Sequence, residues 1–433
     1  MNPLSIAIIA IAAMFVLILM HVPIGVSMGA IGFTGVILFA GLKPALTTIA
    51  AETVTALSSV DLAVIPLFLL MGNFASAAGI SKEMYNLANG LLGRFRGGIA
   101  MATVGGCGLF GAVCGSSFAT TATFGRVALP EMIQRGYAPT IATGCIAGGG
   151  TLGSLVPPSI ILVIYAIMAE QSIIELFIAA IIPAVITILL YFLAIMVYVR
   201  IYREAGPAGD RVSGKQLFNI TLRSWGAIFL LVVIAGGIYG GVFTVTEAAS
   251  LGAIVSFLLA VIRKKMTVKL FWEALTNTAT TTAMIYTIII GASIFNYFIV
   301  LSHMPEAMTK GILESGWPVF IIFAVLLFVY IILGSLFDTV AAMVITLPFV
   351  LPLIVDMGYS PVWWGIVNVV VIEIGMITPP IGINVFILQG VSHDYPLSVI
   401  YRGVIPFLCA DFVRLAVLVL FPILSIWLVT FLR

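Results

Sequence analysis

One proline-bearing motif occurs twice in the sequence, and both copies interrupt apolar stretches that would otherwise form membrane helices. The first copy is Gly153–Ser159 (Gly-Ser-Leu-Val-Pro-Pro-Ser), and the second, Gly375–Ile381 (Gly-Met-Ile-Thr-Pro-Pro-Ile), begins 222 residues later. Paired prolines end a helix because each lacks an N–H donor and its ring clashes with the preceding turn. The motif therefore predicts two helices broken at equivalent positions of two repeats, which is the best sequence indication of a transporter binding site.

Composition places the chain in a membrane. Of its 433 residues, 62% are hydrophobic and only 8% are charged, whereas soluble domains carry about 25% charged residues. Since about 20 apolar residues span a bilayer, we predict an all-α polytopic membrane protein. Its apolar runs are 4–20, 23–42, 61–79, 140–168, 174–199, 225–241, 246–262, 275–301, 362–389 and 403–431. Two further regions, 98–133 and 318–353, are apolar but interrupted near their middles by small and polar residues.

Basic residues orient these runs, because cytoplasmic loops are enriched in Lys and Arg. Two basic groups, one in 200–223 and one in 263–269, flank a pair of apolar runs, so both groups are predicted to be cytoplasmic. The first group is Arg200, Arg203, Arg211, Lys215 and Arg223. With Lys82, Arg94 and Arg96 before it and Arg135 after it also inside, region 98–133 must enter and leave on one side, and its arms of about 15 residues favour a re-entrant hairpin. The same reasoning makes 318–353 a hairpin that enters from outside.

The repeat extends beyond the double prolines. Residues that match at an offset of 222 or 223 are Pro130 and Pro352, 136–139 and 358–361, and Gly29 and Gly252. Because matching loops fall on opposite faces, the sequence predicts repeats of inverted topology. We expect a first repeat over 1–199, with hairpin 98–133 and broken helix 140–168. A cytoplasmic linker follows over 200–224. The second repeat covers 225–433, with hairpin 318–353 and broken helix 362–389.

The middle of the first hairpin carries small and hydroxyl-bearing residues, Gly115-Ser-Ser-Phe-Ala-Thr-Thr-Ala-Thr123. Small residues allow a tight tip, and hydroxyls together with freed backbone carbonyls can replace the hydration shell of a cation. Sodium is a hard cation and prefers oxygen ligands, as calcium and magnesium do. Small-residue helix packing is the alternative, but the position opposite a Pro-Pro break favours ion binding.

The second hairpin tip contains an acid, Asp338, in the position that Ser116 holds in the first. An ionisable group within a membrane indicates a functional site, so we expect Asp338 to bind a cation; an exposed turn residue is the alternative. Glu373 is a second intramembrane acid. It either contributes to the site or neutralises a neighbouring dipole or arginine.

Several residues suit an organic anion. Asn384 follows the second break by about one turn, although ordinary interhelical hydrogen bonding is the alternative. The half-helix that starts at Ser159 presents free N–H groups, which favour a carboxylate. Arg126 either binds a substrate carboxylate or extends to the cytoplasmic surface, which we favour, whereas Asp411 and Arg414 can pair on one helix face. The candidate substrate-binding residues are Ser117, Thr120, Ser159, Asn384 and Arg126.

Taken together, four segments resemble the large membrane subunit, of the DctM type, of tripartite ATP-independent periplasmic (TRAP) transporters. They are 114–132, 149–159, 241–249 and 377–384. The resemblance covers essentially the whole chain, and the combination is specific. It departs at Val245, where the family commonly has proline. That position lies between Thr244 and Glu247, which supply the residue types of a helix-starting capping box.

The resemblance implies an elevator-type fold, similar to that of the divalent-anion/sodium symporters, with a scaffold and a transport domain that holds both hairpins. It implies sodium-driven secondary import of an organic acid, a C4-dicarboxylate or related carboxylate, across a bacterial inner membrane. No cofactor is implied besides the coupling sodium ions. Two partners are implied: a periplasmic substrate-binding protein and a small four-helix membrane subunit.

Carried over position by position, the resemblance implies two sodium sites. The first is Ser116, Ser117, Gly153, Val156 and Ser159. The second is Asp338, Thr339, Gly375, Thr378 and Pro379.

Other functions remain open at this point. A stand-alone sodium/dicarboxylate symporter without a binding protein is the main alternative, and proton coupling through Asp338 or Glu373 is another. An intramembrane enzyme would need paired carboxylates or a nucleophile with a base in one pocket, and a channel fits two non-identical hairpins poorly. No Gly-x-x-x-x-Gly-Lys-Ser/Thr loop is present, so ATP is not expected to drive this chain. Nothing in the sequence favours nucleic-acid binding.

Overall fold

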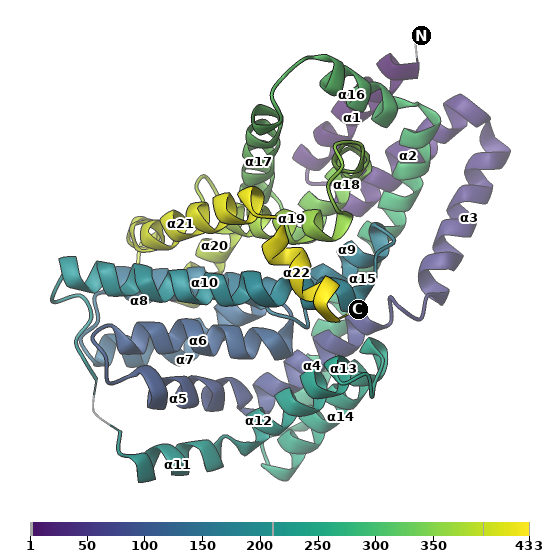
Figure 1. Cartoon of the computed structure of the whole chain (residues 1–433). Helices are drawn as coiled ribbons and strands as arrows, with labels where there is room; N and C mark the ends of the chain where they lie inside the picture. Colours follow the sequence, from purple (N-terminus) through teal and green to yellow (C-terminus); the bar gives the residue numbers. More distant parts are fainter. Residues whose placement is uncertain (1–2, 210–211, 393, 433) are drawn as a thin grey trace.

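A computed structural model describes residues 3–209, 212–392 and 394–432. Every named element in these ranges is helical (Figure 1), which confirms the predicted all-α membrane fold. Within the same ranges, six helices are long and apolar enough to cross a membrane, or nine if each bent pair is one span. Arg211 of the first basic group lies outside the described residues.

Both predicted hairpins are pairs of helices joined by a tight tip. The first pair is α6 (Gly98–Cys114) and α7 (Ser117–Gln134), and the second is α17 (Val319–Leu336) and α18 (Thr339–Asp356). Gly115 turns the first tip with φ 64°. Ser116 and Asp338 then cap the returning helices, each accepting a backbone N–H three residues on, from Ala119 and Ala341. Short oxygen-bearing side chains are preferred at this helix-starting position.

Both double-proline motifs break a helix where the sequence predicts. In the first repeat, α8 (Pro139–Leu155) and α9 (Ile160–Met168) meet at an angle of 42°. In the second, α19 (Pro361–Ile377) is followed by α20 (Ile383–Val391). Ser159 starts α9 by accepting the Leu162 N–H, whereas Gly382, with φ 59°, starts α20.

The repeat is visible in how the remaining helices pack. Helix α2 (Ile24–Ala40) packs along α15 (Val268–Leu301), and its equivalent α14 (Val245–Ile262) packs along α4 (Val64–Ala78). A Cβ atom on Gly32 would lie 2.6 Å from the backbone nitrogen of Phe295. Small residues thus bring these helices into close contact, as is usual in membranes. Thr244 and Glu247 form the predicted capping box at the start of α14.

In Figure 1, α6, α7, α8 and α10 (Ile173–Ile201) lie side by side, and α21 (Leu397–Leu420) packs against α8 and α10. Helices α3 (Leu42–Ser58) and α14 lie along the opposite edge. The N-terminal helix is α1 (Pro3–Leu19), and α5 (Ile80–Leu92) and α16 (Met304–Glu314) lead into the two hairpins. The first hairpin and its broken helix therefore lie on the side opposite α3 and α14, while α17 and α18 of the second hairpin lie near α1, α2 and α16 at the top of Figure 1.

Three apolar runs differ from their predicted extent. Helix α15 starts at Val268, before the predicted 275, and is continuous where the first repeat has separate helices α3 and α4. Ser59 separates those two helices by accepting the Leu62 N–H. Run 403–431 is two helices, α21 and α22 (Ile423–Leu432), because Pro422 cannot continue the first.

Run 225–241 begins as α12 (Trp225–Leu231), passes through a π-helical turn (Val232–Gly236) and ends as α13 (Gly237–Tyr239). The predicted linker over 200–224 also contains a helix, α11 (Gly214–Arg223), which starts at a capping box formed by Ser213 and Gln216. The division of the chain into repeats at this linker remains a prediction.

Candidate functional site

The two hairpin tips meet at one small cavity of about 60 Å³. The first tip contributes 115–118 and the second contributes Asp338, Thr339 and Val340. The cavity is also lined by Leu69 of α4 and by three residues of α15, Thr281, Met284 and Ile285. The remaining lining residues lie around the first break and are Ser154, Ile160 and Ile161. Its volume accommodates ions or a few water molecules, whereas pockets for organic ligands are roughly 300–1,000 Å³.

At the first tip, the hairpin packs directly on the broken helix α8. A Cβ atom on Gly153 would lie 2.5 Å from the carbonyl oxygen of Ser116 and 2.6 Å from Oγ1 of Thr120. Thr120 Oγ1 itself donates to the Ser116 carbonyl at 2.8 Å. The Ile160 N–H at the start of α9 donates to the Gly115 carbonyl at 3.3 Å. Tip and break are therefore joined by backbone groups.

The same junction holds the other residues assigned to the first sodium site. Ser159 accepts the Leu162 N–H at 3.4 Å and donates its own proton to the carbonyl of Ser154. Val156 ends α8 in an extended conformation. The structure thus brings Ser116, Gly153 and Ser159 to one junction of tip and break.

The second junction has the same construction. A Cβ atom on Gly375 would lie 2.6 Å from the carbonyl carbon of Gly334. The Gly382 N–H donates to the Ser335 carbonyl at 3.2 Å, and Thr378 Oγ1 donates to the Ile374 carbonyl at 2.5 Å. Asp338 caps α18 through one carboxylate oxygen, 2.7 Å from the Ala341 nitrogen. Pro379 is exposed, so this break is more open than the first, whose prolines are buried.

One residue that the sequence analysis did not single out connects the two tips. The sulfur of Met376 lies 3.9 Å from Ser117 Oγ in the first tip and 2.8 Å from Thr339 Oγ1 in the second. Its side chain is fully buried. A methionine in an apolar run does not by itself indicate such a role. The repeat could have indicated it, because Met376 holds the position that Ser154 holds in the first repeat, and Ser154 lines the cavity.

The candidate substrate-binding residues do not all reach this cavity. Of these, Ser117 lines it, and Thr120 and Ser159 lie at the junction behind it. Arg126 is exposed on α7, where its Nε donates to the Ala122 carbonyl at 3.2 Å. Asn384 is fully buried in the first turn of α20, and its amide has no hydrogen-bond partner among the described residues. Neither Arg126 nor Asn384 lines the cavity.

A buried ionic cluster lies beside the second break. Arg414 Nη2 is 3.0 Å from Asp411 Oδ1, as the sequence predicts for this pair, and Arg414 Nη1 is 3.7 Å from Glu373 Oε2. Tyr191 donates to Asp411 at 2.8 Å, and Arg414 donates to Thr187 at 2.9 Å. All five residues are fully buried. Glu373 therefore faces a neighbouring arginine, and it does not line the cavity between the tips.

The described residues contain no group of three or more His, Cys, Asp or Glu side chains that could hold a metal ion. The oxygen atoms near the tips come from hydroxyls, backbone carbonyls and the single carboxylate of Asp338. Such a set suits a monovalent hard cation better than a transition metal, which prefers nitrogen and sulfur ligands.

Comparison with known proteins assigns this architecture to a family. Residues 11–424 match the model of "Tripartite ATP-independent periplasmic transporter, DctM component". The chain is 34% identical over 363 residues to the C4-dicarboxylate TRAP transporter large permease protein DctM of Pseudomonas aeruginosa, covering 84% of each chain. It is 32% identical to the isethionate TRAP transporter permease protein DctMQ of Oleidesulfovibrio alaskensis, covering 88% of this chain and 59% of that protein.

Among solved structures, the YdaH transporter of Alcanivorax borkumensis superposes with a TM-score of 0.63 over 90% of both chains at 15% identity, so it supports the fold alone. The family match extends over both hairpins, both broken helices and the helices on the opposite side of the molecule. The chain therefore belongs to the DctM component family of tripartite ATP-independent periplasmic transporters.

Proposed function

We propose that this permease imports an organic acid, a C4-dicarboxylate or a related carboxylate, by coupling its movement to that of sodium ions. The observation that carries the proposal is the convergence of both hairpin tips on one cavity that contains hydroxyls and the carboxylate of Asp338. Two junctions of tip and break, each with freed backbone carbonyls, supply oxygen ligands for two sodium sites. Sodium bound there would hold each tip in the position that completes the substrate site.

The substrate would enter only after the tips separate from the scaffold. The present cavity of about 60 Å³ is far smaller than a pocket for an organic acid. Opening therefore requires the hairpins to move relative to α4 and α15, which close the cavity. Because Leu69, Met284 and Ile285 present apolar side chains at this boundary, the two parts can slide without breaking directional bonds there.

We attribute this movement to an elevator mechanism. Each hairpin is fixed to its broken helix by a close glycine contact. Gly153 of α8 packs on the backbone of Ser116 at the first tip, and Gly375 of α19 packs on the backbone of Gly334 in the second hairpin. The hairpins and broken helices would therefore move as a unit, while the reciprocal α2/α15 and α4/α14 pairs remain in place. Inverted repeats provide the two end states, because the same contacts can form on either side of the membrane.

Two partners and a location complete the proposal. A periplasmic binding protein would deliver the substrate to this subunit, which would lie in a bacterial inner membrane. A small four-helix membrane subunit would extend the scaffold. The name DctMQ of one relative, and its length beyond the matched part, fit a fusion of the two membrane subunits. Helix α3, which exposes Leu46, Val54 and Leu57, offers an apolar face for such a partner or for lipid.

The test is uptake of a labelled C4-dicarboxylate into proteoliposomes that contain this chain and the small subunit. Uptake would be measured with and without an inward sodium gradient and with and without the purified binding protein. We expect transport only when both are present. Uptake with sodium alone would instead identify a stand-alone sodium/dicarboxylate symporter, and uptake that follows a proton gradient would overturn sodium coupling.

A further inference from the structure

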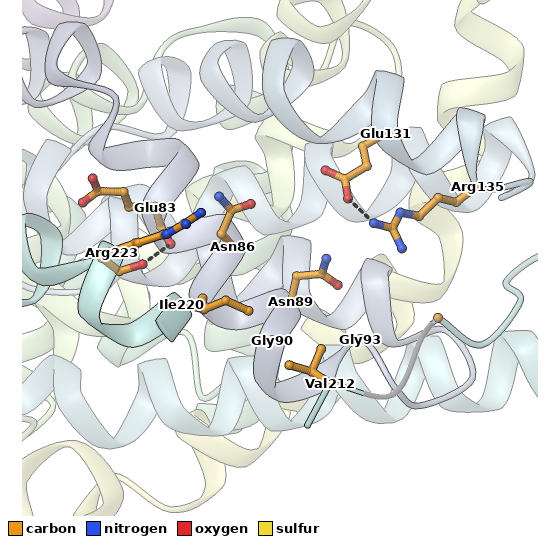
Figure 2. A pocket seen from close by; sticks show the side chains of 12 residues that line it. Glu83, Asn86, Asn89, Gly90, Gly93, Glu131, Arg135, Val212, Ile220 and Arg223 are labelled. Carbon is orange, nitrogen blue, oxygen red and sulfur yellow. Dashed lines mark hydrogen bonds and ion pairs between the residues drawn. The ribbon is translucent and has the colours of Figure 1, made fainter. Parts of the chain in front are cut away.

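A second and larger cavity, of about 350 Å³, lies away from the hairpin tips (Figure 2). It is enclosed by α5, by the C-terminal end of α7 and by the end of the linker helix α11. Its lining combines glycine and aliphatic residues with charged and amide side chains. The charged and amide side chains are Glu83, Asn86, Asn89, Glu131, Arg135 and Arg223. A volume of this size falls in the range of small-ligand sites.

The acids in this lining are already paired. Glu131 lies 3.0 Å from Arg135, and Glu83 lies 2.6 Å from Arg263, which is outside the cavity. Arg223 makes no ion pair in the part of the chain that the structure describes. Figure 2 shows its side chain next to Asn86, with the amides of Asn86 and Asn89 between Arg223 and Arg135. The cavity thus presents an unpaired guanidinium and two amides, groups that donate to phosphate oxygens.

The helix that carries Arg223 is built to lie at a membrane surface. Helix α11 buries none of its residues completely and exposes 63% of Phe218 and 55% of Leu222. Trp225, which follows directly, is 52% exposed. An amphipathic helix with basic residues on its polar face lies in the interface with its apolar face among the acyl chains. Tryptophan is enriched at the same depth.

The repeat supplies a control for this interpretation. A cavity of about 350 Å³ also lies between α16, α15 and the end of α18, where Glu306 and Thr309 hold the repeat positions of Glu83 and Asn86. Its charged lining residues are Glu306 and Asp356, and the described lining includes no Lys or Arg. The walls from α5 and α7 recur as α16 and α18, whereas the α11 wall is replaced by Asn296 and Val300 of α15, and of these two cavities basic side chains line only the one at α11. The Lys and Arg distribution predicts that this face is cytoplasmic, where anionic lipids attract basic groups.

We propose that the cavity between α5, α7 and α11 binds the phosphate of an anionic phospholipid from the cytoplasmic leaflet. Arg223, Asn86 and Asn89 would contact the phosphate oxygens, while Phe218 and Leu222 would lie against the acyl chains. A soluble phosphate offers the same headgroup chemistry but gains nothing from the apolar residues. Because one wall is the returning arm of the first hairpin, a bound lipid would join α7 to the linker.

The test uses the purified full-length chain, depleted of lipid in detergent, with binding measured by native mass spectrometry. The probes are phosphatidylglycerol, phosphatidylcholine and inorganic phosphate. We expect phosphatidylglycerol to be retained in preference to phosphatidylcholine and to survive millimolar phosphate. Arg223→Gln should weaken its binding roughly fivefold, the usual effect of one basic residue near an anionic surface. The matched control is Lys269→Gln, which removes one charge from the same predicted face at an exposed residue paired with Glu273.

Equal retention by Arg223→Gln and Lys269→Gln would overturn the proposal. So would equal binding of the two lipids, and displacement by inorganic phosphate would identify a free-anion site instead. If Arg223→Gln fails to fold, Asn86→Leu, which leaves the net charge unchanged, tests the same site through its retention of phosphatidylglycerol, which should also fall. No sodium or substrate is present in the measurement, so a negative result would leave the proposed transport function untouched.

Discussion

Replacing Gly153 by alanine should impair sodium binding more than it impairs folding. The new Cβ atom would lie 2.5 Å from the Ser116 carbonyl oxygen, whereas real Cβ contacts essentially never fall below 3.0 Å. The Ser116 backbone, or α8 itself, would have to move by about 0.5 Å. Binding sites need their ligands within about 0.5 Å of the productive geometry, so this displacement is enough to disturb an ion site.

The effect of Gly153→Ala on stability should be modest, because two contributions oppose each other. Inserting a methyl group into a packed contact costs about 1–3 kcal/mol. Alanine gains about 1 kcal/mol over glycine within a helix, and Gly153 lies in α8. The net loss of unfolding free energy should therefore be at most about 2 kcal/mol, a change that leaves the protein folded in detergent.

The assay is thermal unfolding of the purified protein over a sodium titration, with uptake in proteoliposomes as the second readout. We expect Gly153→Ala to raise the sodium concentration for half-maximal stabilisation by about tenfold, which corresponds to about 1.4 kcal/mol. Gly311→Ala is the matched control, because no atom lies within 4 Å of its added Cβ and the residue lies in α16. A folded Gly153→Ala protein with an unchanged sodium dependence would refute the assignment of this junction to an ion site.

Three further predictions concern charge. Asp338→Asn should leave the Tm measured without sodium unchanged, because Asn caps a helix as well as Asp does. It should raise the sodium concentration for half-maximal uptake, and an unchanged concentration would exclude the carboxylate as a ligand. Arg414→Met should lower the free energy of unfolding by about 3–5 kcal/mol, because it leaves Asp411 and Glu373 buried without a cation. Urea unfolding of the variant measures this loss, and a loss below about 1 kcal/mol would mean that the cluster is not ionised. Import of a dianion should carry net positive charge inward only if more than two sodium ions accompany it, since two merely neutralise it, and a charge-to-flux ratio in proteoliposomes measures this directly.

The sequence was sufficient to predict the elements that depend on local backbone chemistry. Pro157 and Pro379 end their helices through local backbone sterics, and the first hairpin tip coincides with Gly115, whose positive φ favours glycine. The predicted break positions and the tight tip within each predicted hairpin are therefore confirmed, whereas the re-entry of these hairpins into the membrane remains a prediction. Pro422 carries the same signal, but it lies inside a long apolar run, so the prediction of one continuous segment over 403–431 is wrong.

Contacts between distant segments could not be predicted in this way. Glu373 and Arg414 are on different helices, and nothing in the local pattern selects the pairing with arginine over a direct role in the site. Met376 could not be distinguished from an ordinary core residue, because its contacts with Ser117 and Thr339 arise only when both hairpins are folded. Local patterns thus located the tips and breaks, whereas tertiary packing determined which side chains meet between them.

The two proposed ion sites share one repeated backbone but differ in the residue that caps the returning helix. Ser116 and Asp338 both start a returning helix and both accept a backbone N–H three residues on. A serine hydroxyl that serves as a cap keeps one lone pair but carries no charge, so a site at the first tip would also draw on backbone carbonyls near the break at 156–159. A carboxylate has a second oxygen and a full charge, so a site at the second tip can be organised around the side chain itself. The repeat therefore fixes where an ion site can form, and the capping residue decides whether backbone or side-chain oxygen dominates it.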